Sequence, residues 1–161
     1  MSEWYLRKYD RDHFWSKIAF RALAKSFVAS VHDGLTVRDV MSIPNIYIFT
    51  NDAFAIGFIG FKYVEKDGFK VVHISALNIS DKFRNRGYGR ELLTQFIELI
   101  KKDSEQEKIL LGVNSSNKNA IKLYKSLGFI NTVHGKEGTV EFDLFEYNLK
   151  KKNNKVLKCL N

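Results

Sequence analysis

The sequence predicts an α/β protein in which about four helices flank a mixed, mostly antiparallel sheet of six to seven strands. Short apolar runs joined by turn residues over 46–79 are typical of strands paired as hairpins. A further apolar run over 108–113 is reached only through an amphipathic stretch, so its strand should lie parallel to the preceding one. With 161 residues, 45% of them hydrophobic, the chain can bury the core of one domain, expected over 1–149.

The first quarter of the chain carries one strand signal and two helix signals. Residues 4–9 alternate well enough to predict a strand, and Asp10 or Asp12 can cap a helix that begins near His13. A second, short helix is expected over 36–40. One face of the first helix is expected to comprise Trp15, Ile18, Ala19, Ala22 and Ser26.

The middle of the chain predicts an antiparallel meander. Strands are expected over 46–50, 54–65 and 69–79, and the residues between them are typical of tight turns. An apolar stripe at helical spacing follows and predicts a helix that ends near residue 103.

The last third predicts one parallel strand, one helix and a closing hairpin. The strand over 108–113 is followed by a helix over 117–127, and Gly128 suits the left-handed cap at its end. Strands over 129–134 and 140–148 complete the sheet.

The composition argues against a membrane-spanning, secreted or disulfide-stabilised protein. No apolar run approaches the roughly 18 residues of a membrane span, and the first residues lack the apolar segment of a signal peptide. Cys159 is the single cysteine, so we expect no internal disulfide and a cytoplasmic location. The formal net charge of +8 comes partly from lysines in a basic tail over 150–161. We expect this tail to be solvated, and nucleic acid is not the expected partner.

A glycine-rich turn joins the strand over 69–79 to the next helix, with the sequence Arg84-Asn85-Arg86-Gly87-Tyr88-Gly89. Glycines let a ligand approach the main chain, and the first turn of a helix leaves amide hydrogens free, so the turn is suited to bind a phosphate. The dinucleotide-binding fingerprint would need a third glycine where Leu92 stands. The phosphate loop of nucleotide hydrolases would need Gly-Lys-Ser/Thr, which is absent.

A second element follows about thirty residues later, over 117–129. Together the two elements resemble the GNAT superfamily of acyl-CoA-dependent N-acyltransferases. Arg84, Gly87 and Gly89 match its Gln/Arg-x-x-Gly-x-Gly/Ala motif, and residues 117–129 resemble its helix with Asn, Ala, Tyr and a terminal Gly-Phe. The resemblance covers roughly 46–149, and earlier residues match only in their order of elements.

The resemblance implies acetyl-CoA as acyl donor and no metal. Pantetheine would lie along the end of the strand over 69–79, and the pyrophosphate would reach the turn. The amide of Leu77 is expected to bind the oxyanion. The implied donor-binding residues are Leu77, Asn78, Ile79, Arg84, Asn85, Arg86, Gly87, Tyr88, Gly89, Arg90 and Asn117.

Two residues are candidates for the chemistry. Tyr124 falls on the family's tyrosine position, which implies that its hydroxyl protonates the departing sulfur. His73 is the candidate general base, because it lies where some histone-acetylating members carry a glutamate and its pKa is near working pH. Alternatives are a water chain or one of Glu65, Glu141 and Asp143.

The resemblance therefore implies an N-acetyltransferase that transfers the acetyl group of acetyl-CoA to a primary amine by direct attack in a ternary complex. The acceptor stays open between a protein N-terminus or lysine, a small amine or polyamine, and an aminoglycoside-like compound. Transfer of a longer acyl group also stays open. In the family two N-terminal helices form one wall of the acceptor site, but core packing is the expected use of Phe14 and Trp15.

The alternative function is a non-catalytic module that binds CoA, or that binds nucleic acid or an acidic partner through the basic tail. A homodimer formed through exposed edges of the last hairpin is compatible with the sequence.

Overall fold

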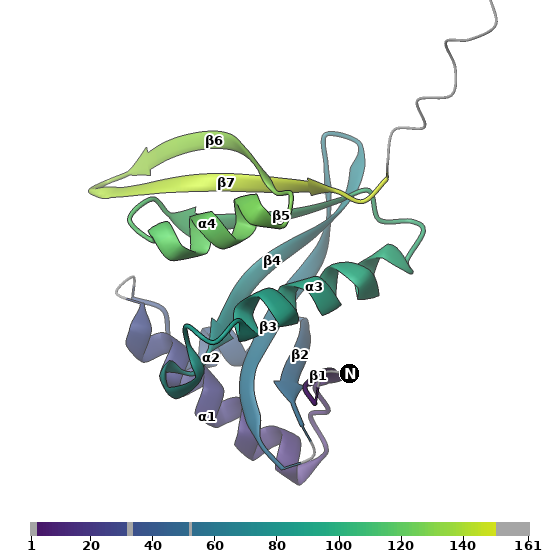
Figure 1. Cartoon of the computed structure of the whole chain (residues 1–161), viewed down its shortest axis with the longest axis vertical. Coiled ribbons are helices and arrows are strands. Elements are labelled where there is room, and N and C mark those ends of the chain that lie inside the picture. Colours follow the sequence, from purple (N-terminus) through teal and green to yellow (C-terminus); the bar gives the residue numbers. More distant parts are fainter. Residues whose placement is uncertain (1–2, 32–33, 52, 151–161) are drawn as a thin grey trace, which may run out of the picture.

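The computed structural model describes residues 3–31, 34–51 and 53–150 (Figure 1). Within these residues, seven strands form one sheet in the order β1-β2-β3-β4-β5-β7-β6. The strands are β1 (Tyr5–Lys8), β2 (Asn45–Thr50), β3 (Ala55–Lys66), β4 (Phe69–Ile79), β5 (Lys108–Asn114), β6 (Ile130–Glu137) and β7 (Val140–Asn148). The helices are α1 (Phe14–Ser30), α2 (Val37–Met41), α3 (Tyr88–Lys101) and α4 (Lys118–Ser126), with a 3-10 turn, η1 (Asp81–Phe83), before α3. The prediction of a mixed α/β fold is confirmed.

The pairing of the strands follows the predicted connections. β4 and β5, which are joined through α3, are parallel, and the other neighbours are antiparallel. The β3–β4 hairpin turns at Asp67 and Gly68, which both adopt positive φ, at 52° and 78°. Such a two-residue turn matches the twist of the strands that it joins. Of the basic tail predicted over 150–161, all but Lys150 lies outside the described residues.

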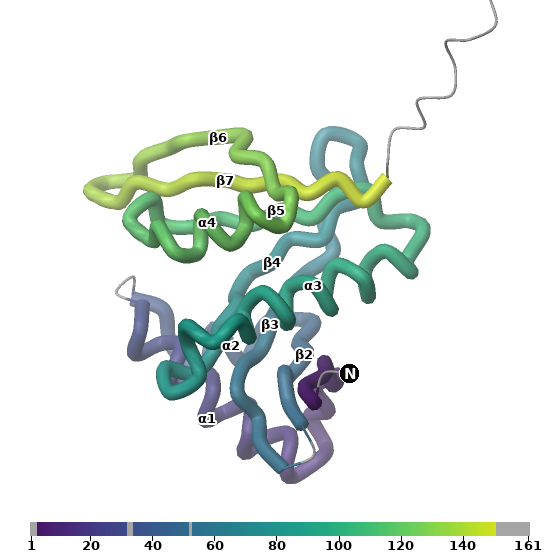
Figure 2. The backbone as a smooth tube through the Cα atoms, viewed as in Figure 1, coloured from purple at the N-terminus to yellow at the C-terminus, as the bar shows by residue number. Residues whose placement is uncertain are grey.

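The sheet separates two hydrophobic layers. On one face, β-strand side chains pack with Leu92, Leu93 and Phe96 of α3 and with Tyr124 of α4. On the other face, α1 and α2 cover a smaller cluster that includes Phe20. The trace in Figure 2 shows α3 crossing the middle strands and α4 following the upper ones.

The start of α1 near His13 is confirmed, whereas the predicted capping residue is wrong. His13 caps the helix in place of Asp10 or Asp12, because its Nδ1 accepts the amide of Ser16 at 3.4 Å. The buried residues are Ser16, Phe20, Leu23 and Ala24. Trp15, Ile18, Ala19 and Ala22 do share one face, as predicted, but this face lines a hollow of about 280 Å³ and is not the buried one.

The physical reason lies in the aromatic rings of the neighbouring layer. Phe20 and Phe27 pack edge to face on Phe58, at 5.2 and 5.6 Å between ring centroids, and bury more apolar area than the alanines of the other face could. Phe14 is 75% exposed and Ile18 is 55% exposed. The expectation that Phe14 packs in the core is therefore wrong, whereas Trp15 is partly buried beside the hollow.

Candidate active site

β4 and β5 separate part of the way along their length. They pair only from Val71 to Ile74, opposite Lys108 to Leu111, and β4 then continues along β3 to Ile79. Figure 1 shows the two strands diverging beyond this point. The edge of β4 that faces β5 is therefore open over residues 75–79, as expected for a strand that pairs with an extended ligand.

A β-bulge marks the point of separation. The neighbouring β3 residues Gly60 and Phe61 pair with Ala76 and Ile74, so Ser75 is an extra residue in β4. Bulges bend a strand and end its pairing, and they are frequent beside active sites. The apolar pattern of the sequence contains a signal for the bulge: Ile74 and Leu77, three residues apart, contact the same hydrophobic layer, which breaks the two-residue period of a strand.

The glycine-rich turn ends in a row of free amides. Gly87 adopts a left-handed φ of 86° and precedes the first residue of α3, without a side-chain cap. The first helical bond runs from the amide of Glu91 to the carbonyl of Gly87, at 3.1 Å. The amides of Tyr88, Gly89 and Arg90 consequently have no partner among the described residues, and the helix dipole adds positive potential there.

Arg84 is turned toward the protein. Its Nε donates to the carbonyl of Ile79 at 2.9 Å and its Nη2 donates to Asn78 Oδ1 at 3.1 Å. Its Nη1 pairs with Asp81 at 2.9 Å, and its amide donates to the Asp81 carbonyl. The side chain therefore anchors the turn to the end of β4. These contacts engage the Arg84 guanidinium and occupy the Ile79 carbonyl.

The other predicted donor-binding residues around the turn have structural contacts of their own. The guanidinium of Arg86 lies 5.9 Å from the ring centre of Phe83. Arg90 donates a hydrogen bond to Ser126 at the end of α4 and so ties the two helices together. Asn85, like Gly87, has positive φ, at 60°.

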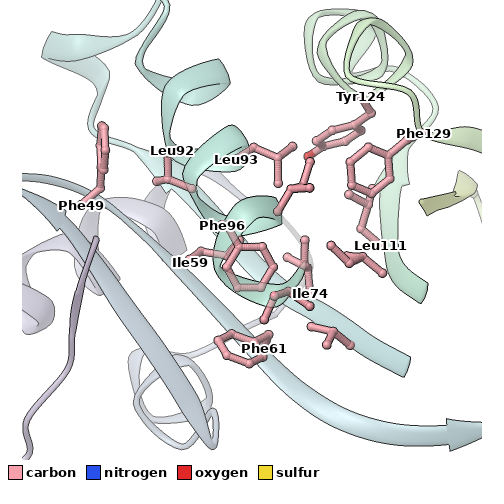
Figure 3. Packing of buried hydrophobic residues seen from close by; sticks show 14 of the residues in the cluster. Phe49, Ile59, Phe61, Ile74, Leu92, Leu93, Phe96, Leu111, Tyr124 and Phe129 are labelled. Carbon is pink, nitrogen blue, oxygen red and sulfur yellow. The ribbon is translucent and has the colours of Figure 1, made fainter. Parts of the chain in front are cut away.

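Asn117 caps α4, and this cap positions Tyr124. Asn117 Oδ1 accepts the amide of Ala120 at 3.1 Å, which satisfies one of the free amides of the helix start. Two turns later Tyr124 packs its ring against Phe129 and Phe145, both at 5.9 Å between centroids. Figure 3 shows this ring extending from α4 toward Leu93 of α3.

Tyr124 is only 8% exposed, and burial raises the pKa of its hydroxyl to about 12. The hydroxyl is therefore protonated at neutral pH. It forms no hydrogen bond with any residue that the structure describes, so its proton is available to a ligand.

His73 lies on the opposite face of the sheet from Tyr124. Val72 and Ile74 face the α3 layer, so the alternation of the strand turns His73 the other way. Burial, followed by the charges of Lys62 and Lys66, lowers the pKa of His73 below its ordinary value. The imidazole is thus neutral near pH 7, and its Nδ1 lies 3.4 Å from Ser75 Oγ at the bulge.

The alternative bases are less suited to the reaction. Asp143 is buried, and its oxygens are engaged by Ser115 and Asn131, each at 2.8 Å, and by His134 at 3.1 Å. Bonds from Asn131 and Ser115 lower the pKa of Asp143 to about 2, so it is a weak base. Glu65 and Glu141 are exposed close to the ends of hairpins.

Searches for other kinds of site give no competing candidate. Among the described residues, no group of three His, Cys, Asp or Glu could hold a metal ion. In the same part of the chain, no helix is long and apolar enough to cross a membrane.

Known proteins share both the sequence pattern and the fold. The sequence profile of the Acetyltransferase (GNAT) family matches residues 3–129. A chain of the NatC complex bound to Gag peptide and CoA superposes with a TM-score of 0.78 at 17% identity, covering 92% of this chain and 100% of that chain. The ribosomal-protein-S18-alanine N-acetyltransferase from Escherichia coli gives 0.74 at 16% identity, covering 96% and 99%.

A plant enzyme gives a similar result. Arabidopsis thaliana NAA60 in complex with acetyl-CoA superposes with a TM-score of 0.72 at 17% identity, covering 90% of this chain and 98% of that chain. At these identities the likeness concerns the fold, whereas the profile match extends over most of the sequence. The chain belongs to the GNAT acetyltransferase family.

Proposed function

We propose that this protein is an N-acetyltransferase that transfers the acetyl group of acetyl-CoA to a primary amine by direct attack in a ternary complex, within one domain over 1–149. One observation carries the proposal. The structure has an open edge on β4, free amides at the start of α3, and Tyr124 in the hydrophobic layer that α3 and α4 share. An acyl-CoA molecule needs these three features: a strand edge for pantetheine, amides for pyrophosphate and a donor for sulfur.

The residues of the turn fit a pyrophosphate. Asn85, Arg86, Gly87, Tyr88, Gly89 and Arg90 would supply the amides, and a Cβ added at Gly87 would meet nothing within 4 Å, so the turn is open. Pantetheine would bind the open main chain of Leu77 and Asn78 and the amide of Ile79. Asn117 would act through the position of α4, and Arg84 through the position of the turn.

Tyr124 would act as a hydrogen-bond donor to the departing sulfur. Its pKa of about 12 exceeds the roughly 8.5 of a thiol, so complete proton transfer to a thiolate would be uphill by about 5 kcal/mol. A hydrogen bond from the neutral phenol stabilises the developing thiolate without that transfer. This modifies the role of full acid that the sequence suggested.

His73 would receive the proton of the attacking amine from the other face of the sheet. A neutral imidazole can accept a proton directly or through water. Its position at the start of the strand separation would place it on the acceptor side, with the acyl donor on the side of Tyr124. The amide of Leu77 remains the proposed oxyanion donor.

Calorimetric titration with acetyl-CoA tests the proposal. The control variant Ala29→Glu adds one negative charge at an exposed position of α1. It should bind acetyl-CoA with the same affinity as the parent protein. Gly89→Glu places a carboxylate at the proposed pyrophosphate site and should weaken binding more than tenfold. A folded parent that does not bind acetyl-CoA would refute the proposal.

A panel of amines then tests turnover through the release of free CoA thiol. Binding without release for every class of amine would favour the non-catalytic CoA-binding alternative. The alternative that uses the basic tail predicts salt-sensitive DNA binding that is lost on deletion of 150–161.

A further inference from the structure

A hollow of about 250 Å³ lies on the face of the sheet opposite α3 and α4. Apolar and polar side chains from β3, β4, β5, β6 and β7 line it. It borders Leu111, where β5 leaves β4, so it opens next to the proposed reaction site. Its lining residues include Lys62, Val64, Lys66, His73, Leu110, Leu144 and Glu146.

The charges of this hollow are not balanced. Lys62 and Lys66 lie four residues apart on β3 and therefore on the same face, and neither forms an ion pair with a residue that the structure describes. Glu146 is the acidic lining residue, and Lys108 already pairs with it at 2.9 Å. Because the pKa of His73 is lowered, its imidazole is neutral near pH 7 and does not change this balance. Two uncompensated positive charges remain.

This field opposes the approach of a simple amine, which is a cation at neutral pH. A carboxylate on the same molecule reverses the effect, because its negative charge is attracted to the two lysines. The register sets the spacing. Lys62 lies directly across from His73, and Lys66 is about 13 Å further along β3.

We propose that this hollow binds the acceptor and selects amines that carry a carboxylate, with Lys62 and Lys66 binding the carboxylate and His73 facing the amine. The proposal rests on the proposed acetyltransferase function. Two sources share this chemistry: a free amino acid, and a peptide N-terminus with an acidic side chain in its first residues.

Binding of product-like probes tests the selection without requiring turnover. Amide signals of the protein are followed by NMR during titration with N-acetylglycine and with its neutral match, N-acetylglycinamide. A second pair uses N-acetyl-aspartyl-alaninamide and its asparaginyl counterpart. At least one acidic probe should bind about tenfold more tightly than its neutral match and shift the signals of Lys62, Lys66 and His73.

The double variant Lys62→Gln, Lys66→Gln should remove this preference. Lys17→Gln, Lys25→Gln changes the net charge equally on exposed α1 and should retain it. Preference in the first pair of probes alone identifies a free amino acid as the source, and preference in the second pair alone identifies a peptide.

Equal affinity for the acidic and neutral members of both pairs would overturn the proposal, as would a preference that survives the double variant. A separate measurement shows whether the proposed acetyltransferase function itself fails. Calorimetry with acetyl-CoA reports on the other face of the sheet, and the probes can be titrated with or without CoA.

Discussion

Alanine at Gly87 and alanine at Gly89 are expected to have opposite effects. Gly87 has a φ of 86°, and an added Cβ would meet nothing within 4 Å, so the cost is that of the left-handed backbone alone, roughly 1–2 kcal/mol. Gly89 does not have positive φ, and its added Cβ would lie 3.5 Å from Leu123 Cδ2, an ordinary contact. As a residue of the first turn of α3, Gly89→Ala should gain up to about 1 kcal/mol of helix stability.

Thermal unfolding and acetyl-CoA calorimetry on both variants separate stability from binding. In a chain of this size, each kcal/mol lost lowers Tm by about 2–4 °C, so Gly87→Ala should unfold earlier than the parent. Gly89→Ala should keep or raise Tm and keep the affinity of the parent for acetyl-CoA, because its methyl group would contact Leu123 and the family motif accepts alanine at this position.

Two outcomes would refute this reasoning. An unchanged Tm for Gly87→Ala would contradict the left-handed conformation of the turn. A large loss of acetyl-CoA affinity in a stable Gly89→Ala variant would contradict the placement of its methyl group against Leu123.

Three other substitutions test the candidate side chains. Tyr124→Phe removes a hydroxyl that bonds to no described residue, so the free energy of unfolding should change by less than about 1 kcal/mol. Release of the CoA thiol should fall roughly 100-fold. Release at the rate of the parent would exclude Tyr124 as the hydrogen-bond donor to the departing sulfur. Because the pKa of His73 is lowered, kcat/KM of the parent should decrease on acidification only below pH 6.5. The variant His73→Gln should react slowly and should not show this decrease. A variant whose pH profile has the same shape as that of the parent would exclude His73 as the general base. The pKa of Asp143 is depressed from 3.8 to about 2, so its stabilisation is present above about pH 4 and lost as pH falls toward 2. Urea unfolding should therefore show Asp143→Asn less stable than the parent at pH 7, with the difference shrinking at pH 3, and a constant difference would refute this.

Most elements could be predicted because their causes are local. The alternation of β2, β3 and β4, the turn at Asp67 and Gly68, and the stripe of α3 depend on neighbouring residues. The parallel pairing of β5 follows from its connection through a helix. The face of α1 could not be predicted in this way, because two apolar stripes compete and the rings of Phe58 and Phe20, from distant parts of the chain, decide between them.

The candidate site likewise has features that depend on neighbouring residues and features that depend on contacts between distant ones. The positive φ of Gly87 is encoded in the turn itself, whereas the inward contacts of Arg84 exist only after Asp81, Asn78 and Ile79 come together. The sequence alone does not identify Lys62 and Lys66 as site residues, because their position relative to His73 depends on the register between β3 and β4.

The bulge at Ser75 connects the opening of the sheet to the packing of its core. Before it, Val72 and Ile74 face the α3 layer; after it, Leu77 and Ile79 face that layer and Ala76 faces α1. Without the extra residue, one of these two sets would turn to the wrong face, because a one-residue slip reverses every side chain of a strand. The burial of Ile74 and Ile79 in one cluster therefore fixes the bulge, and the bulge fixes the point at which β4 leaves β5. The opening is thus held by core packing, so it does not depend on a ligand to form.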